Sequence, residues 1–548
     1  MKKKIWCTAW ILSGFIMGGC GAGQGAEPDS ELAQELQIPD ETAENKTSET
    51  EIISTDELDN DAANHDDMNN EALDSEASKQ TQTGEHLPAI GITTEKKEWY
   101  TDDGETLLLT VTADKVTVEE NGFDALNAAL SAQWDGLTKG YEELLQSAKE
   151  HYQSEKDFGY YFSNYYHHEN VVAYRIDNRV ASFCCIYDSY EGGAHGNYDF
   201  DGATFDVKSG KKMQLEDMLS DAEGFYDKAV SYLTAELEEN YGDGLFPEYR
   251  EVVKEDTFSE TPACWYLDNT GIVIQYNPYS VAPFATGAPS VTLPYDVFAE
   301  YLKEEYTSPC SSMVARVKEN EDISRLLGID GKVMLVSAHD EEYGETEVTV
   351  VSGDSSETVG EFSRFLMGYA VKRADGRSFL VFYCDYASDD FVTYVYEVTD
   401  GNVRACDKLE GASFEGGYSG TSDKFYLGTD TLSLYMHLDV LGTYLGSMKY
   451  QLTEEGKLVQ TEEVFAVDTA FELKVVKDLP VTLAGAETTI PVGSVLKITG
   501  TDNAGTAYFR LDTGETGTIS YVRDDEQWQL LIDGVSENEY FEMVPYAG

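Results

Sequence analysis

The chain has 548 residues, of which 102 are acidic and 38 are basic, so its formal net charge at pH 7 is −64. This balance excludes nucleic acid as a partner, because binding to phosphates needs stripes of basic side chains. Strong negative charge instead attracts cationic partners through long-range electrostatic steering. At roughly 100–200 residues per domain, the length predicts several domains.

The N-terminus has the pattern of a targeting signal. Three lysines (residues 2–4) precede an apolar stretch over residues 5–17, which is followed by Gly18, Gly19 and Cys20. The apolar stretch is shorter than the roughly 18 residues of a membrane span. The pattern resembles a bacterial lipoprotein signal peptide over residues 1–19, with lipid attached to Cys20; an ordinary secretory signal with an incidental cysteine is the alternative. We therefore expect a lipid-anchored protein on the extracytoplasmic face of the cell membrane.

Residues 20–91 form an acidic segment. Residues 21–90 contain 19 Asp or Glu, two Lys and no Phe, Tyr or Trp. Such a composition cannot bury enough apolar surface to offset the entropy of ordering, so it predicts a disordered stalk. A specific acidic binding tail is the alternative interpretation.

Cysteine usage indicates neither a metal site nor a disulfide-dense scaffold. Six cysteines follow Cys20, and no two have CxxC spacing. An extracytoplasmic location permits disulfides, but the sequence leaves the pairing open. We expect no metal and no cofactor. The six are Cys184, Cys185, Cys264, Cys310, Cys384 and Cys406.

Residues 92–306 are expected to form an α+β recognition domain. Alternating residues over 107–118 predict a strand, and apolar residues at spacings of three and four from Phe123 to Leu144 predict a helix. Residues 158–190 have strand composition, and a second helix pattern runs from Leu215 to Leu237. Strands are expected over 271–279 and 290–298, and a short helix near Tyr306.

Two β-rich units are expected to follow. Over residues 315–470, short strand runs alternate with the turn signals DGK, DGR, DGN and EGK, which favours an all-β middle domain, with a propeller as one interpretation. Residues 472–548 resemble a bacterial SH3-like domain, which implies a small β-barrel at the C-terminus. The aromatic residue expected after the last glycine pair is replaced by Thr518 and Ile519.

The stretch YEGGAHGNYDFDGATFDVKSGKKMQLEDML (residues 190–219) raises the question of a site. His195 with Asp199 and Asp201 could ligate a metal, and an envelope hydrolase is the corresponding alternative function. A catalytic zinc site usually needs a third protein ligand at good geometry, which the sequence cannot place, and the stretch has no recognisable nucleophile motif. The structural interpretation treats Gly192, Gly193 and Gly196 as turn residues and His195 as a buried, hydrogen-bonded side chain. We expect the structural role, with ligand contact as the next alternative.

Two aromatic stretches are candidate ligand-binding surfaces. The run over residues 158–168 includes Tyr161 and Tyr165, whose rings could stack on sugars or contribute to a protein interface, or pack in the core. The stretch YNPYSVAPFATGAP (residues 276–289) is free of charge and carries Tyr279 and Phe284. An uncharged aromatic loop suits the centre of an interface, and equally a packed loop that crosses the domain.

Residues 190–219 together with residues 265–298 resemble the domain pair DUF4163 and DUF3298. This pair forms the outer part of lysozyme-sensing anti-sigma factors of the RsiV type and the N-terminal region of deacetylases of the PdaC type. The resemblance covers residues 95–306. The chain carries a lipoprotein-like signal in place of the sigma-binding segment, and "ATFDVKSG" is not the deacetylase motif. The resemblance therefore implies extracytoplasmic recognition of a cell-envelope ligand, either peptidoglycan or a cationic protein such as lysozyme, without enzyme activity.

Overall fold

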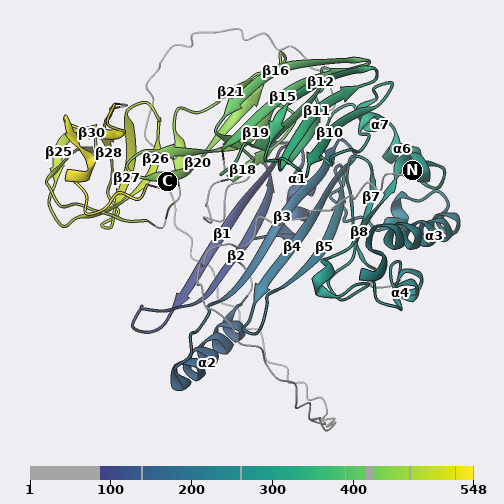
Figure 1. The fold of residues 1–548 in the computed structure, drawn as a ribbon, viewed down its shortest axis with the longest axis horizontal. Helices are drawn as coiled ribbons and strands as arrows, with labels where there is room; N and C mark the ends of the chain where they lie inside the picture. The colour runs from purple at the N-terminus through teal and green to yellow at the C-terminus, as the bar shows by residue number, and fades with distance from the viewer. Residues whose placement is uncertain are drawn as a thin grey trace, which may run out of the picture. The chain divides into compact units, whose positions relative to one another are not determined.

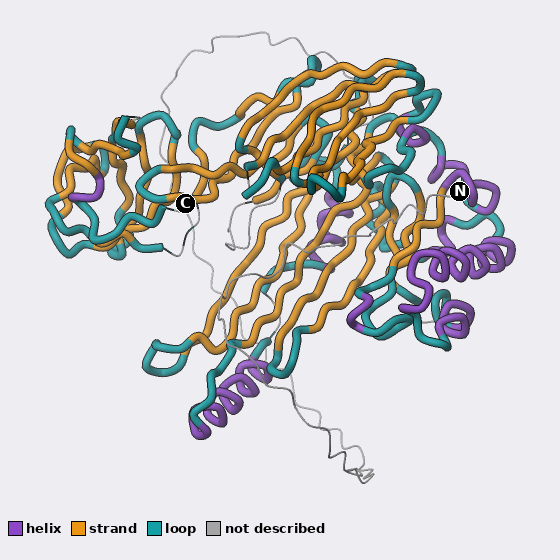
Figure 2. The backbone as a smooth tube through the Cα atoms, in the orientation of Figure 1, coloured by secondary structure: helices purple, strands orange, loops and turns teal. Residues whose placement is uncertain are grey.

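The computed structural model describes residues 87–137, 140–259, 262–388, 390–414, 424–467, 469, 471–524 and 526–546. Residues 83–548 form one compact unit. The expected signal peptide, Cys20 and most of the acidic segment lie outside the described residues. The described part is mostly β, with some helices (Figures 1 and 2). Its helices are all too short or too polar to cross a membrane.

Five long strands form the N-terminal part of the main sheet (Figure 1). They are β1 (Ile90–Tyr100), β2 (Leu107–Val118), β3 (Tyr165–Asp177), β4 (Val180–Tyr190) and β5 (Asn197–Asp206). All neighbours pair antiparallel except β2 and β3, which are parallel. Parallel neighbours need a crossover connection, and helices α1 (Asp124–Gln133) and α2 (Glu142–Phe158) lie in it.

The single helix expected from Phe123 to Leu144 is two helices. The chain leaves α1 at Trp134, which is extended, and the N–H of Val116 in β2 donates to the Trp134 carbonyl at 3.1 Å. The indole packs edge-on against Phe183 and Phe205, with ring centroids 5.3 and 6.1 Å away. Burial of Trp134 against the sheet therefore overrides a continuous helical pattern.

The opposite face of β3–β5 is covered by a small antiparallel sheet. It consists of β6 (Cys264–Leu267), β7 (Gly271–Gln275) and β8 (Ser290–Pro294). Helix α3 (Ala222–Tyr241) packs on it through Phe225, Ala229, Leu233 and Leu237, which recur every four residues and so share one helix face. The short elements around it are η1 (Leu215–Met218), η2 (Gly242–Gly244), α4 (Tyr249–Glu255), η3 (Phe284–Thr286), α5 (Tyr295–Phe298), η4 (Ala299–Tyr301) and α6 (Glu304–Thr307).

Strand β9 (Met313–Val317) joins the N-terminal strands to the rest of the sheet. It pairs antiparallel with β3 on one side and with β13 (Arg364–Lys372) on the other. The N-terminal end of β1 also pairs with β18 (Lys424–Leu427). Main-chain hydrogen bonds therefore cross the expected boundary between residues 306 and 315.

The middle of the chain is built of antiparallel hairpins. The turn signals DGR, DGN and EGK lie in the connections β13–β14, β15–β16 and β20–β21, and Gly376, Gly401 and Gly456 have positive φ there. The strands are β10 (Val333–Asp340), β11 (Glu345–Ser352), β12 (Ser355–Phe362), β14 (Ser378–Asp385), β15 (Phe391–Thr399), β16 (Asn402–Glu410), β17 (Ala412–Ser413), β19 (Thr431–Asp439), β20 (Thr443–Leu452), β21 (Leu458–Gln460) and β22 (Phe465–Val467), with α7 (Ser324–Leu327) before them.

The C-terminal strands continue the same hydrogen-bonded network through a pairing of β22 with β26. This network includes β23 (Leu473–Lys474), β24 (Leu479–Leu483), β25 (Ala486–Ile490), β26 (Val495–Thr501), β27 (Thr506–Leu511) and β28 (Thr516–Ser520). A separate three-stranded sheet consists of β29 (Val522–Asp524), β30 (Gln529–Ile532) and β31 (Val535–Ser536), and η5 (Glu537–Glu539) follows it. Within the described residues, the ladder runs β23–β26–β27–β28–β24–β25 and does not close into a barrel. The fold is thus a large multi-stranded sheet with additional helices.

Candidate functional site

An aromatic cluster forms where the turn before β5 and the first residues of β5 meet the loop over residues 276–289. The rings of His195 and Phe284 are stacked, with centroids 4.3 Å apart and planes inclined by 22°. Tyr198 lies 5.3 Å and Tyr279 6.0 Å from the same Phe284 ring. The structure therefore brings together three candidate residues from two separate parts of the sequence, namely His195, Tyr279 and Phe284. We call His195, Tyr198, Tyr279 and Phe284 the aromatic cluster.

His195 is exposed, which corrects the expectation of a buried, structural histidine. It lies in the connection between β4 and β5, where Gly192 and Gly193 have φ of 88° and 102°. Its Nδ1 lies 2.7 Å from the carbonyl oxygen of Gly196. The glycines turn the chain as expected, and the turn presents the imidazole to solvent and to Phe284.

The loop over residues 276–289 is fixed along its length. At its start, the Asn277 side chain accepts the Phe200 N–H at 2.8 Å, which connects the loop to β5. At its end, the buried Gln275 side chain donates to the Ala288 carbonyl at 2.9 Å. Val281 and Ala282 are fully buried. Part of the loop therefore packs into the domain, and part of it faces solvent.

Tyr279 faces solvent with an unusual backbone. Its φ is 66°, in the left-handed region that bulky residues rarely adopt, and its side chain is 55% exposed. Its N–H donates to the Ala282 carbonyl at 3.1 Å, and the Ser280 N–H donates to Asn277. A strained backbone persists only where the surrounding structure holds it in place, and such residues are concentrated at functional sites.

Asp199 and Asp201 do not join His195. Side chains alternate along a strand, so these two carboxylates lie on the face of β5 opposite Tyr198 and Phe200. That face is continuous with Cys185 and Tyr187 of β4, which pair with Asp201 and Asp199. Among the described residues, no group of three His, Cys, Asp or Glu side chains is arranged to hold a metal ion.

Tyr161 and Tyr165 have different environments. Tyr165 is 6% exposed and packs against Phe162 and His151, and burial, followed by the nearby Glu191 and Tyr190, raises the pKa of its phenol. Tyr161 is 89% exposed. Phe158 and Tyr160 are also exposed, with stacked rings 6.2 Å apart. This run is therefore half core and half surface.

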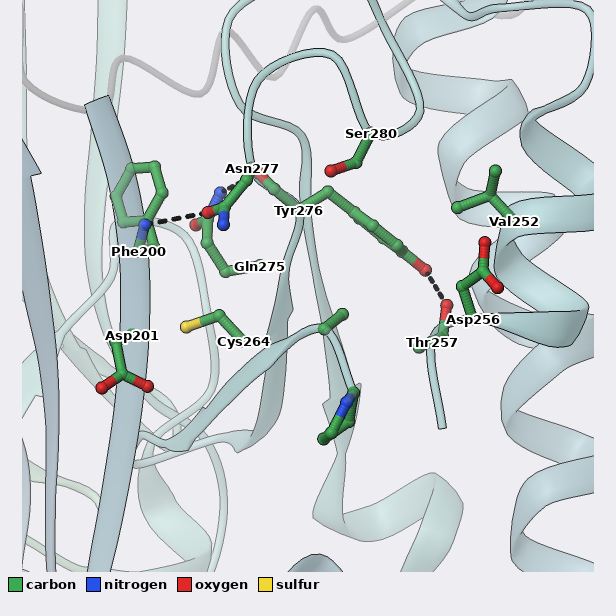
Figure 3. Close-up of a pocket in the computed structure, with 12 residues that line it drawn as sticks. Phe200, Asp201, Val252, Asp256, Thr257, Cys264, Gln275, Tyr276, Asn277 and Ser280 are labelled. Carbon is green, nitrogen blue, oxygen red and sulfur yellow. Dashed lines mark hydrogen bonds between the residues drawn. The ribbon is translucent and has the colours of Figure 1, made fainter. Parts of the chain in front are cut away.

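A cavity of about 340 Å³ lies between β5, β7 and α4, next to the start of the loop (Figure 3). On one side, the hydroxyls of Thr257 and Tyr276 are 2.8 Å apart. On the other side, Figure 3 shows the sulfur of Cys264 pointing toward the strand that carries Phe200 and Asp201. Asp256 and Ser280 also line it, so its wall is largely polar.

The fold and the cluster describe a β-rich protein in which a small helix-covered sheet presents an aromatic loop beside a long-stranded sheet. Residues 216–296, which include α3, β6–β8 and the aromatic loop, match the family described as "Protein of unknown function (DUF3298)", so the chain carries a DUF3298 domain there. The match confirms that part of the sequence-based resemblance.

Solved structures of the same family are similar to the chain. One is a DUF3298 family protein from Pseudomonas aeruginosa PAO1, with 20% identity over 40% of this chain and 94% of its own, and a TM-score of 0.29. Another is a DUF3298 family member from Bacteroides fragilis, with 19% identity over 40% of this chain and 95% of its own, and a TM-score of 0.30. No curated protein matches the chain.

Tyr198 and Asn277 are members of the site that the sequence patterns did not single out. Tyr198 is two positions before Phe200 on β5, so both side chains lie on the same face of the strand and contact the small sheet. Asn277 precedes Pro278 in the loop, and an asparagine at such a position is typical of an ordinary turn. The two-residue period of a strand could have predicted that Tyr198 lies on the same face as Phe200. No local pattern could have predicted the partner of Asn277, because Phe200 is far away in the sequence.

Proposed function

We propose that the protein is a lipid-anchored, extracytoplasmic binding protein, and that the aromatic cluster recognises a cationic wall-active protein such as a lysozyme. The observation that carries this proposal is the position of Tyr279. Its ring is more than half exposed, its backbone is held at positive φ, and its loop is hydrogen-bonded at both ends. A rigid exposed aromatic side chain loses little entropy on binding and suits the centre of a protein interface.

The charge around the cluster favours a cationic partner. Residues 269–295 contain no charged side chain, although the chain as a whole is strongly acidic. Two exposed acidic residues belong to segments that contact the loop. Glu191 is in the turn that carries His195, and Asp243 precedes Gly244, whose carbonyl accepts the Thr286 hydroxyl at 3.0 Å. An apolar centre with an acidic rim complements a basic protein and accelerates its association.

Calorimetric titration of the full-length protein with purified lysozyme tests the proposal. Tyr279→Ala and Phe284→Ala are each expected to weaken binding by roughly ten-fold or more, as interface hot spots do. Tyr343→Ala is the matched control, because Tyr343 is 72% exposed and belongs to another segment, the turn between β10 and β11. Raising the salt concentration should slow association.

The same titration separates the alternatives. Binding of soluble peptidoglycan fragments, but not of lysozyme, with loss in Tyr279→Ala would make the ligand a glycan. No binding of either, or binding unaffected by both substitutions, would contradict the proposal. The position of Asp199 and Asp201, on the opposite sheet face from the cluster, weighs against the hydrolase interpretation.

The domain assignments form part of the proposal. We propose that the long-strand region before residue 216 is the DUF4163-type partner of the DUF3298 domain, and that residues 472–548 are an SH3-like module. The antiparallel order of β26–β27–β28 and the turns between them support the second assignment.

Lipidation of Cys20 is tested separately. Cys20→Ala should release the protein from the membrane fraction or leave its signal unprocessed, whereas the wild-type protein should fractionate with membranes. Wild-type protein found soluble in the medium, with an N-terminus other than Cys20, would contradict this part alone.

A further inference from the structure

We infer that Cys184 and Cys264 form a disulfide that fastens the DUF3298 domain to the long-stranded sheet. Cys184 lies in β4 and Cys264 in β6, and their sulfur atoms are 3.9 Å apart although the residues are 80 positions apart in the chain. Among the six cysteines of the described residues, this is the only pair whose sulfur atoms are in contact. The inference does not depend on the proposed function.

The backbones of β5 and β6 come unusually close to each other. Gly202 of β5 pairs directly with Cys184 of β4. A Cβ atom at Gly202 would overlap the carbonyl oxygen of Trp265, the residue after Cys264. Only glycine therefore allows β6 to cross β5 at this point, and the crossing places Cys264 over Cys184.

Neighbouring contacts hold the two sheets in this register. The N–H of Leu267 in β6 donates to the Ser182 hydroxyl of β4 at 2.8 Å. The rings of Tyr174 and Tyr266 pack with centroids 4.2 Å apart. The two sulfur atoms, now 3.9 Å apart, must approach each other to the roughly 2 Å of a sulfur–sulfur bond when the disulfide forms.

The positions of the two thiols set the order of the reaction. Cys264 lines the cavity of Figure 3 and is partly exposed, whereas Cys184 is buried. The hydrogen bond to Cys264, together with burial, raises the pKa of Cys184 well above its usual value. Cys264 is therefore the thiol that meets an external oxidant first.

The exchange needs a disulfide-bearing oxidant, either a small disulfide or a thiol–disulfide oxidoreductase. The Cys264 thiolate attacks one sulfur of the oxidant, forms a mixed disulfide and releases the other sulfur as a thiol. The Cys184 thiolate then attacks the Cys264 sulfur and releases the second thiol. The two protein thiols lose two electrons and two protons, and the oxidant gains them as two thiols.

The other cysteines serve as internal controls. Cys185 is adjacent to Cys184 but points to the opposite face of the sheet, where it packs in the large core. Cys310 is buried, and its thiol donates to the Asp177 carboxylate at 3.3 Å. Neither Cys185 nor Cys310 contacts another cysteine sulfur among the described residues, so both should remain free thiols when the disulfide forms.

The experiment incubates reduced full-length protein with oxidised glutathione, alkylates the remaining thiols under denaturing conditions and maps the peptides by mass spectrometry. A cross-linked peptide joining residue 264 to the 184–185 segment is expected in the wild type and in Cys185→Ser. It should be lost in Cys184→Ser. Oxidation should also raise the wild-type melting temperature by about 5 °C.

Three results would overturn the inference. They are Cys264 recovered only as alkylated peptide, Cys264 recovered only as its glutathione adduct, and a cross-link that persists in Cys184→Ser. If Cys184→Ser does not fold, fragmentation of the wild-type cross-linked peptide decides between residues 184 and 185. Assignment of the bond to Cys185 would contradict the inference equally.

Discussion

The imidazole of His195 lies face to face with the ring of Phe284, at 4.3 Å between centroids, and both residues belong to turns that only tertiary structure brings together. One turn connects β4 to β5, and the other connects β7 to β8. The stack therefore joins the long-stranded sheet to the DUF3298 domain at the solvent-exposed side of the aromatic cluster.

His195→Ala is expected to lower the free energy of unfolding by less than about 1 kcal/mol. The side chain is exposed, so its removal strands no buried partner, and the loss is one aromatic stack. Urea denaturation of the variant and the wild type measures the difference. A loss of about 3 kcal/mol would show that the imidazole supports the fold. If the proposed function holds, the same variant should still bind lysozyme less tightly.

The buried ion pair of Arg175 and Asp177 should control stability strongly. Arg175 Nη2 and Asp177 Oδ2 are 2.7 Å apart, and both side chains are fully buried. Arg175 also donates to the Tyr295 hydroxyl at 2.7 Å. Asp177→Asn should cost about 3–5 kcal/mol at neutral pH, because it leaves a buried guanidinium without its counter-charge. Chemical denaturation measures this cost.

A matched exposed pair serves as the control for Asp177→Asn. Lys474 and Glu542 lie 2.8 Å apart with both side chains more than half exposed. Glu542→Gln should therefore change stability by less than about 1 kcal/mol. Equal effects of the two substitutions would contradict the assigned importance of burial.

The acid dependence of stability gives a second readout for Asp177. Burial alone would raise the pKa of this carboxyl, but Arg175 and the N–H groups of Val180 and Arg179 outweigh burial and lower the pKa. A lowered folded-state pKa adds stability above the unfolded value of about 3.9, and this contribution is lost as the pH falls below it. The stability difference between wild type and Asp177→Asn should therefore shrink below about pH 4. A difference independent of pH would contradict the argument.

Gly202→Ala should destabilise the contact between β5 and β6. The added methyl would overlap the Trp265 carbonyl, which is backbone and cannot rotate away, so a cost of about 1–3 kcal/mol is expected. Gly244→Ala is the control, because its methyl would meet only the Thr286 side chain, at 3.3 Å. Thermal unfolding compares the two variants. Similar melting temperatures would show that β6 can shift without cost.

Truncation should distinguish the acidic segment from the folded part. Leu87 and Ile90 are 5% and 0% exposed, and Ile90 pairs with Leu427, so packed residues precede the expected domain start at residue 92. A protein starting at Leu87 should unfold like the full-length protein. A protein starting at Ile92 should lose about 3–6 kcal/mol, since two large apolar side chains leave the core. Equal stability of both truncations would contradict the burial of these residues.

Local signals in the sequence determined the individual elements of this protein. Residues 375–377, 400–402 and 455–457 turn the chain where a glycine relieves the strain of positive φ, and that requirement is met within a few residues. The apolar positions from Leu215 to Leu237 predicted the region of η1 and α3, because one helix face must be buried. The strongly acidic composition and the charge-free loop are likewise properties of the sequence alone.

Long-range packing decided the rest. Trp134 ends α1 because its indole is buried against Phe183 and Phe205, which no local pattern reveals. The pairings of β9 with β3 and β13 bring together residues that are far apart in the sequence. The free energy of closing such long loops is not contained in the strand propensities of the individual residues. The turn before β5 carries His195 to Phe284, whereas strand alternation leaves Asp199 and Asp201 on the opposite face of β5. Alternation also places adjacent Cys184 and Cys185 on opposite faces. The contacts of His195 with Phe284 and of Cys184 with Cys264 therefore depend on the packing of the two sheets against each other, which is close at Gly202.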